Sequence, residues 1–324
     1  MSPRPVVVVT RRLPEQVERE LAGDFDARLN QEDRPLGPEG LMEALRTADA
    51  VLCTVTDKLT ADVLAAEPRR AGLLANFGVG FNHIDTGAAK ARGIAVSNTP
   101  DVLTDATADI AMTLLLMVSR RTGEGERHLR AGAWTGWRPT HMLGTQVSGK
   151  TLGLVGMGRI ARAVAQRAHH GFGMKVIYHD PYPPPAEVAR SLGAEPRNSL
   201  EDVLREADFV SLHCPATPET RHLMNRERLA LMRPGAYLIN TARGDVVDEA
   251  ALVEALRGRK LAGAGLDVFE REPQVAEELV GMENVVLLPH LGSATTETRV
   301  AMGMRALENL RLFFAGKPLR DRVV

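Results

Sequence analysis

This sequence has little cysteine and almost no excess of charge of either sign. Its 324 residues include two cysteines, Cys53 and Cys214, which excludes a disulfide framework and fits a reducing compartment. The 40 Lys and Arg residues nearly balance the 41 Asp and Glu residues, so the chain lacks the basic surface that binds nucleic acid. We therefore expect a cytoplasmic protein with no nucleic-acid partner.

Long apolar runs are missing as well. The longest internal run, residues 110–118, has about half the length of a bilayer crossing and predicts a buried helix. The four valines at 6–9 are too few for a signal peptide and predict a first strand. The histidines and cysteines show no spacing typical of a metal site. We therefore expect no membrane partner and no metal.

The chain does contain a regular alternation of short apolar runs with helix-like segments. This alternation is typical of parallel α/β sheets, and 324 residues suit two domains. We predict two Rossmann-like or flavodoxin-like α/β domains, with a dinucleotide-binding domain at residues 101–289 inserted into a substrate domain made of residues 1–100 and 290–324. A long amphipathic helix near residues 295–314 is expected to return to the first domain.

A glycine-rich turn at residues 156–161 lies in the second alternating segment, directly after an apolar run of strand length. Gly156 allows a tight turn, and Gly158 lacks the Cβ that would keep a pyrophosphate away from the backbone. Ala161 stands at the third position, where the fingerprint tolerates alanine. The following helix points its first N–H groups and its positive dipole end at the anion. Asp180 follows at about the 20-residue spacing of the acid that binds the ribose, so the segment predicts dinucleotide binding.

Three polar residues follow three later apolar runs, at the strand ends where open parallel sheets bind ligands. Arg243 offers a planar guanidinium that matches a carboxylate. His290 can exchange a proton with an alcohol oxygen, and Glu272 can hold its tautomer and favour its charged form. Each alone is more commonly an ion pair or a structural residue, but together with a nicotinamide they suit the reversible oxidation of a 2-hydroxy acid.

With these segments the chain resembles the D-isomer-specific 2-hydroxyacid dehydrogenases over nearly its full length. The segments that carry the resemblance are the glycine fingerprint and residues 77–85, 240–248, 265–273 and 289–295. The resemblance implies that Arg243 anchors the substrate, that His290 is the acid/base and that Glu272 is its partner. It also implies that the amides of Val79 and Gly80 bind the substrate carboxylate.

Further contacts are expected around these groups. Substrate contacts are expected from Thr56 and Trp137, and Asp267 is implied to hold the nicotinamide amide. The other expected cofactor contacts are Thr104, Gly156, Gly158, Arg159, Ile160, Asp180, Cys214 and Thr241.

Both tryptophans of the chain, Trp134 and Trp137, stand in residues 121–146, a stretch that lacks a regular pattern. Packing within the subunit and a subunit contact explain such an arm equally well. The arm is similar to that of the glyoxylate/hydroxypyruvate reductase branch of the family. This similarity implies a homodimer through the NAD domain and the arm, with Trp137 approaching the partner's active site.

The residue at the ribose position favours NAD(H) over NADP(H). A 2′-phosphate beside the Asp180 carboxylate would meet repulsion of roughly 4 kcal/mol per charge pair at an effective dielectric of 20, before screening. Some reductases of this branch use NADPH and carry basic residues here, whereas this chain has Arg159 as its only nearby cation.

The expected activity is reduction of small 2-oxo acids, glyoxylate and hydroxypyruvate, to D-2-hydroxy acids with NADH. Two alternatives stay open. One is another dehydrogenase of the family, acting on D-lactate, D-glycerate or phosphoglycerate. The other is a dehydrogenase-like protein that senses NADH by binding partners, which turnover would distinguish from an enzyme.

Overall fold

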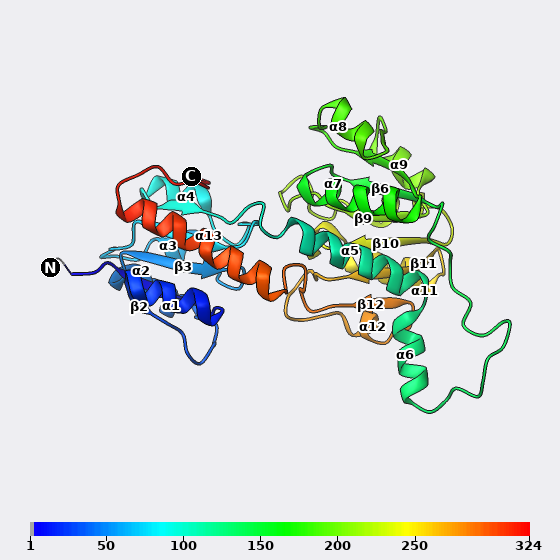
Figure 1. Cartoon of the computed structure of the whole chain (residues 1–324), viewed down its shortest axis with the longest axis horizontal. Helices are drawn as coiled ribbons and strands as arrows, with labels where there is room; N and C mark the ends of the chain where they lie inside the picture. Colours follow the sequence, from blue (N-terminus) through cyan, green and yellow to red (C-terminus); the bar gives the residue numbers. More distant parts are fainter. Residues whose placement is uncertain (1–2) are drawn as a thin grey trace. The chain divides into compact units, whose positions relative to one another are not determined.

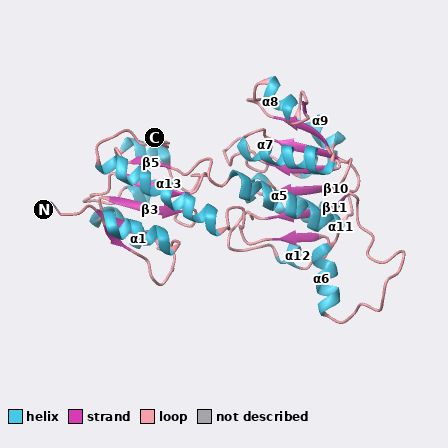
Figure 2. Cartoon of the chain, viewed as in Figure 1, coloured by secondary structure: helices cyan, strands magenta, loops and turns pink. Residues whose placement is uncertain are grey.

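The computed structural model describes residues 3–324, which divide into two compact units (Figure 1). The first unit contains the residues up to Leu103 together with Ala294–Val324, and the second is Thr104–Ser293. Each unit has one parallel sheet flanked by helices (Figure 2). The prediction of two parallel-sheet α/β domains, one inserted into the other, is confirmed.

The first unit has a five-stranded sheet in the order β2-β1-β3-β4-β5. Its strands are β1 (Val6–Val9), β2 (Asp26–Arg28), β3 (Ala50–Thr54), β4 (Leu73–Phe77) and β5 (Ala95–Ser97). Its helices are α1 (Glu15–Asp24), α2 (Pro38–Thr47), α3 (Ala61–Leu64), α4 (Thr86–Ala91) and α13 (Thr296–Phe314). This is the flavodoxin-like order, so the loops after β1, β3 and β4 lie at the edge where such sheets bind ligands.

The second unit has a seven-stranded sheet in the order β12-β11-β10-β9-β6-β7-β8. Its strands are β6 (Thr151–Val155), β7 (Lys175–His179), β8 (Ala194–Pro196), β9 (Phe209–Leu212), β10 (Ala236–Asn240), β11 (Leu261–Leu266) and β12 (Val285–Leu287). Its helices are α5 (Thr104–Ser119), α6 (Thr122–Arg130), α7 (Arg159–Gln166), α8 (Ala186–Ser191), α9 (Leu200–Glu206), α10 (Arg226–Leu231), α11 (Glu249–Arg257) and α12 (Glu277–Val280), with a π-helical turn at Arg167–Gly171 and a 3₁₀ turn at Gly244–Val246. The strand order reverses between β6 and β9, which is the switch point of a dinucleotide-binding sheet.

The central strand β10 shows how the second sheet is buried on both faces. All five of its residues are buried, and the four apolar ones alternate between two hydrophobic cores. Leu238 packs in the core formed with α9, α10 and α11. Tyr237 and Ile239 pack on the opposite face, in the core formed with α5 and α7. Burial on both faces explains why such strands read as continuous apolar runs in the sequence.

The last helix, α13, packs against β4 and α1 of the first unit (Figure 1). Its Arg311 forms ion pairs with Glu20 (3.0 Å) and Asp24 (2.6 Å). After the helix, the end of the chain runs antiparallel to β5, and the Val323 amide donates to the Val96 carbonyl (2.7 Å). The first unit is therefore completed by a segment that follows the whole second unit.

The structure corrects the interpretation of residues 121–146 as lacking regular structure. Helix α6 occupies Thr122–Arg130, although it contains two glycines and buries none of its residues. The sequence of this segment therefore shows neither a high helical propensity nor an apolar stripe, and it did not predict a helix. None of the helices in residues 3–324 has the length and apolar character that a bilayer crossing requires.

Candidate active site

The glycine turn lies at the switch point of the second sheet, between the ends of β6 and β9. Gly156 has φ +93, and a Cβ on it would lie 3.1 Å from the carbonyl carbon and oxygen of His213. Glycine is therefore required both by its backbone conformation and by the close approach of the loop after β9.

The same turn leaves room for an anion. A Cβ on Gly158 would meet no protein atom within 4 Å, and no side chain caps the start of α7. Thr241, at the end of β10, has a buried hydroxyl without a hydrogen-bond partner among the described residues. An open glycine, an uncapped helix start and an unsatisfied buried hydroxyl fit a dinucleotide.

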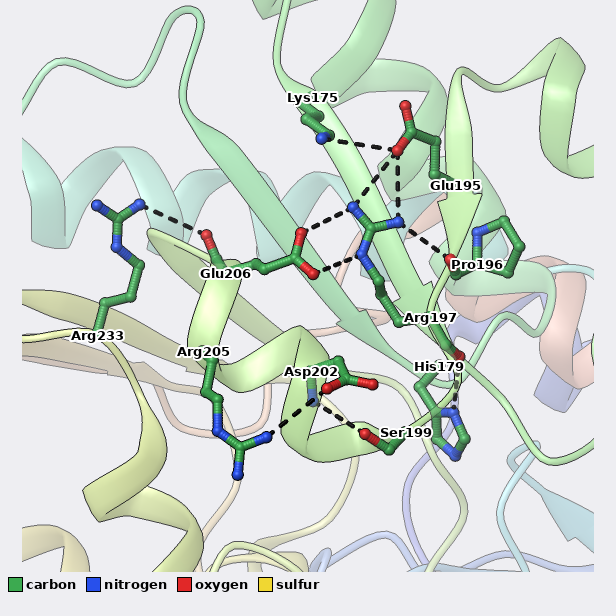
Figure 3. A network of polar contacts seen from close by, with 10 residues as sticks. All are labelled: Lys175, His179, Glu195, Pro196, Arg197, Ser199, Asp202, Arg205, Glu206 and Arg233. Carbon is green, nitrogen blue, oxygen red and sulfur yellow. Dashed lines mark hydrogen bonds and ion pairs between the residues drawn. The ribbon is translucent and has the colours of Figure 1, made fainter.

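Asp180 is held beside the turn by two backbone amides. Its carboxylate accepts hydrogen bonds from the amides of Met157 (2.6 Å) and Tyr182 (2.7 Å). The preceding residue is fixed as well, because His179 Nδ1 donates to the Arg197 carbonyl (3.2 Å) (Figure 3). The carboxylate is therefore oriented before any ligand arrives.

Figure 3 also shows what anchors Arg197. Its guanidinium makes two hydrogen bonds of 2.8 Å to the carboxylate of Glu206 on α9 and two longer ones to Glu195 on β8. Paired N–H···O bonds of this kind fix the plane of the guanidinium. The edge of the sheet next to Asp180 is thus tied to α9.

The two residues that directly follow β9, His213 and Cys214, are uncharged at neutral pH. Burial lowers the pKa of His213 to about 4, and its Nε2 shares a 2.9 Å hydrogen bond with the Ser211 hydroxyl. Burial also raises the pKa of the Cys214 thiol to about 11. Neither side chain supplies charge next to the glycine turn at neutral pH.

A histidine–carboxylate pair lies beyond the ends of β11 and β12. His290 Nδ1 donates to Glu272 Oε2 over 2.9 Å, and about a third of each side chain is exposed. Burial opposes ionisation of Glu272, but the hydrogen bond and charge of His290 and the charge of Arg243 hold the pKa of Glu272 below its ordinary value. The pair leaves His290 Nε2 as the ring nitrogen that can exchange a proton with a ligand.

Asp267 shapes the segment that carries His290. It is buried, and its carboxylate accepts hydrogen bonds from the amides of Leu291 (2.6 Å) and Gly292 (2.8 Å). The His290 amide donates to the Asp267 carbonyl (2.9 Å), and His290 has φ +55. This left-handed conformation is uncommon for a non-glycine residue and persists because the surrounding hydrogen bonds fix it.

Arg243 is brought near the pair by a close contact between two loops. A Cβ on Gly244 would lie 1.9 Å from the Phe269 carbonyl carbon, so only glycine lets the loop after β10 approach the loop that carries Glu272. Burial lowers the pKa of Arg243, which the charges of Glu272 and Asp245 oppose. A half-buried guanidinium beside a His–Glu pair suits a small acid with a reducible carbonyl.

The first unit contains the other expected substrate contacts. The half-buried amides of Val79 and Gly80 donate to no acceptor among residues 3–324, an arrangement that suits an anion. The hydroxyl of Thr56 shares a hydrogen bond with the Thr54 hydroxyl (3.0 Å) and accepts one from Arg11 (3.3 Å).

The remaining expected site residues lie on separate elements. Thr104 begins α5, and Arg159 and Ile160 begin α7. Trp137 is 81% exposed and Trp134 is 53% exposed, both in the loop that follows α6. Within residues 3–324 no group of three or more His, Cys, Asp or Glu side chains is arranged to hold a metal ion.

The structure adds residues that the sequence did not single out. Asn76 and Asn98 bind the carbonyls of the loop that contains Val79 and Gly80. Asparagine at a strand end is too common to indicate such a contact. The carbonyls that Asn76 binds lie two and four residues later in the chain, and the one that Asn98 binds lies 19 residues earlier, so these contacts depend on how the loop folds back on the strand ends.

The chain is similar to a known protein family and to known proteins, both in sequence and in structure. Residues 112–292 match the family model described as D-isomer specific 2-hydroxyacid dehydrogenase, NAD binding domain. A glyoxylate reductase from Thermococcus kodakarensis is 46% identical over 318 residues, which cover 97% of this chain and 94% of the relative.

Two solved structures are similar over nearly their full length. An NADPH-dependent glyoxylate/hydroxypyruvate reductase from Sinorhizobium meliloti, in complex with NADP and malonate, has a TM-score of 0.88 at 36% identity and covers 99% of this chain and 97% of its own. A D-mandelate dehydrogenase from Rhodotorula graminis, in its holo form, has a TM-score of 0.87 at 32% identity and covers 99% and 98%. The chain therefore belongs to the D-isomer specific 2-hydroxyacid dehydrogenases.

Proposed function

We propose that this chain reduces glyoxylate and hydroxypyruvate to 2-hydroxy acids, of D configuration where the product is chiral, with NADH as the hydride donor. The observation that carries the proposal is the His290–Glu272 pair beside Arg243, at the carboxyl edge of a sheet that also presents a dinucleotide fingerprint. The glyoxylate reductase relative and the glyoxylate/hydroxypyruvate reductase structure support the choice of substrate.

When bound, a reduced nicotinamide would supply the hydride for reduction of the carbonyl group of the 2-oxo acid. Protonated His290 donates from Nε2 to the carbonyl oxygen, while Nδ1–H stays bonded to Glu272. The carboxylate of Glu272 stabilises the imidazolium before transfer and keeps the tautomer after it. Arg243 polarises the carbonyl and pairs with the substrate carboxylate.

The first unit serves as the substrate domain in this proposal. The unpaired amides of Val79 and Gly80 bind the substrate carboxylate, and Thr56 contacts the substrate. Trp137 belongs to the second unit, and in the proposed homodimer it approaches the partner's active site and limits substrate size there.

The second unit serves as the dinucleotide-binding domain. Gly156, Gly158, Arg159 and Ile160 hold the pyrophosphate. Thr104, Cys214 and Thr241 are further cofactor contacts, and Asp267 holds the nicotinamide amide. The Asp180 carboxylate accepts hydrogen bonds from the ribose hydroxyls.

Asp180 favours NADH over NADPH in this proposal. Its two oxygens accept hydrogen bonds from the amides of Met157 and Tyr182, which hold the carboxylate beside the glycine turn, where it would repel a 2′-phosphate. The relative from Sinorhizobium meliloti is NADPH-dependent, so the cofactor must be tested together with the substrate.

The active form in this proposal is a cytoplasmic homodimer. The exposed side chains of Trp134, Trp137 and Leu143 on the arm after α6 suit an apolar subunit contact. The free cysteines fit a reducing compartment. Sedimentation at several concentrations tests the dimer, and a monomer at assay concentration contradicts it.

Initial rates with four 2-oxo acids, each measured with NADH and with NADPH, test the activity. The substrates are glyoxylate, hydroxypyruvate, pyruvate and phenylglyoxylate, which is the 2-oxo acid of D-mandelate. We expect the highest kcat/KM for glyoxylate or hydroxypyruvate with NADH. In the variant His290→Asn, which tolerates the left-handed backbone, kcat should fall about 10²- to 10⁴-fold while NADH affinity is retained. Tight NADH binding without turnover of any 2-oxo acid would instead identify a binding protein.

A further inference from the structure

Two asparagine side chains fix the carbonyls of the loop that follows β4. Asn76, which is 1% exposed on β4, donates from Nδ2 to the carbonyl of Gly78 (3.1 Å) and to that of Gly80 (3.0 Å). Both amide hydrogens are used, so these partners define the orientation of the side chain. Asn98, directly after β5, donates from Nδ2 to the carbonyl of Val79 (2.8 Å).

These contacts set the direction of the two unpaired amides. In a planar trans peptide the C=O of one residue and the N–H of the next point in opposite directions. The carbonyl of Gly78, held by Asn76 and by the backbone N–H of Thr99 (3.0 Å), aims the Val79 N–H away from Asn76. The carbonyl of Val79, held by Asn98, aims the Gly80 N–H away from Asn98 in the same way.

We infer that Asn76 and Asn98 are positioning residues for substrate binding: each orients one peptide plane so that its N–H is presented to the substrate carboxylate. The inference rests on the proposed function, in which Val79 and Gly80 bind that carboxylate. Neutral amides suit this role because they fix the dipoles without adding a charge that would attract or repel the substrate.

The end of the chain holds Asn98 in turn. The backbone N–H of Asn98 donates to the backbone carbonyl of Asp321 (3.2 Å). The Asp321 carboxylate accepts hydrogen bonds from Arg305 (2.6 and 2.7 Å) and from Asn309 (3.0 Å), all on or after α13. The direction of the Gly80 N–H therefore depends on a tail that lies more than 200 residues later in the sequence.

The experiment uses Asn98→Ala, Asn76→Ala and the double variant in the full-length protein. Asn284→Ala is the matched control, because Asn284 also donates an amide hydrogen to a backbone carbonyl, that of Ala262 (3.1 Å), before β12. Thermal unfolding and NADH affinity show whether each variant is folded. The steady-state substrates are glyoxylate and its methyl ester, which keeps the aldehyde and lacks the charge.

We expect KM for glyoxylate to rise about tenfold in Asn98→Ala and by less in Asn76→Ala, where the Thr99 N–H still holds the Gly78 carbonyl, with kcat within about threefold of the original. Activity with the methyl ester should change less than twofold, and the control should match the unsubstituted protein with both substrates. An equal loss with glyoxylate and its ester, or an unchanged KM in folded Asn98→Ala, would overturn the positioning role.

Binding of oxamate, a non-reducible 2-oxo acid analogue, separates this inference from the proposed activity. Calorimetry on the NADH complex should show about tenfold weaker oxamate binding in Asn98→Ala than in the Asn284→Ala control. If the unsubstituted protein reduces no 2-oxo acid, the proposed activity fails, while the oxamate ratio still tests the loop. Equal oxamate affinities in the two variants refute the role of Asn98.

Discussion

Replacing Glu272 by Gln removes the charge of the histidine–carboxylate pair while keeping the length of the side chain. The glutamine carbonyl oxygen can accept the hydrogen bond that His290 Nδ1 donates over 2.9 Å, whereas its NH2 group cannot accept the one that the Phe269 amide donates to Glu272 Oε1 (3.1 Å). The tautomer of His290 is thus preserved, but the negative charge that stabilises its protonated form is lost. The proposed reduction uses that protonated form, so the variant should lose activity at a lower pH than the original protein.

The size of the shift follows from the geometry of the pair. A charge-assisted hydrogen bond contributes about 1.5–3 kcal/mol, and the one-third exposure of both side chains places this pair toward the lower part of that range because water screens it. At 1.36 kcal/mol per pH unit, the alkaline limb of the rate profile for reduction should move down by about one to two pH units. The maximum rate on the acid side should stay within a few-fold.

The assay measures kcat for NADH oxidation with saturating glyoxylate from pH 5 to pH 9. Glu272→Ala serves as the companion variant, because it removes both charge and acceptor and should also lower the maximum rate. Superimposable profiles for Glu272→Gln and the original protein would show that the carboxylate does not stabilise the proton donor. The assignment of the pair as the acid/base system would then be wrong.

Two further changes test the cofactor site and the chain end. Asp180→Asn removes the charge at the ribose position, so the ratio of kcat/KM for NADPH to that for NADH should rise at least about tenfold, and an unchanged ratio in steady-state assays contradicts the cofactor argument. Asp321→Asn should lower the free energy of unfolding by about 3 kcal/mol at pH 7, because Arg305 and Asp321 form a buried pair. Burial opposes ionisation of Asp321, but its hydrogen bonds with Arg305 and Asn309 lower its pKa, so this stabilisation is present above about pH 4 and is lost as the pH falls further. The difference in the free energy of unfolding between the two proteins, measured with urea, should therefore be smaller at pH 3 than at pH 7, and equal differences refute the pairing.

The sequence could predict the parts of the fold whose signal is local. The glycine fingerprint and the apolar runs mark the strands of both sheets, because a strand buried on both faces needs a run of apolar residues. Helix α6 and strand β8 left no such signal: α6 buries no side chain, and β8 is a three-residue edge strand that ends in Pro196.

In the candidate site, too, the residues with a local signal could be predicted and the others could not. His290, Glu272 and Arg243 could be proposed from the sequence because parallel strands end at one edge of a sheet. The hydrogen bonds by which Asp267 holds the amides of Leu291 and Gly292 could not be predicted, because they depend on the path of a loop.

The two units contribute polar groups of different kinds, and this difference has a kinetic consequence. In the proposed function, the loop of the first unit binds the substrate through backbone amides that Asn76 and Asn98 orient, and none of these groups titrates near neutral pH. The proton that the proposed reaction consumes comes from the pair in the second unit, His290 with Glu272. The rise in KM caused by Asn98→Ala should therefore be the same at every pH between 6 and 9, even where kcat changes steeply. A rise in KM that follows the kcat profile would mean that carboxylate binding depends on the charge of the histidine pair and not on the oriented amides.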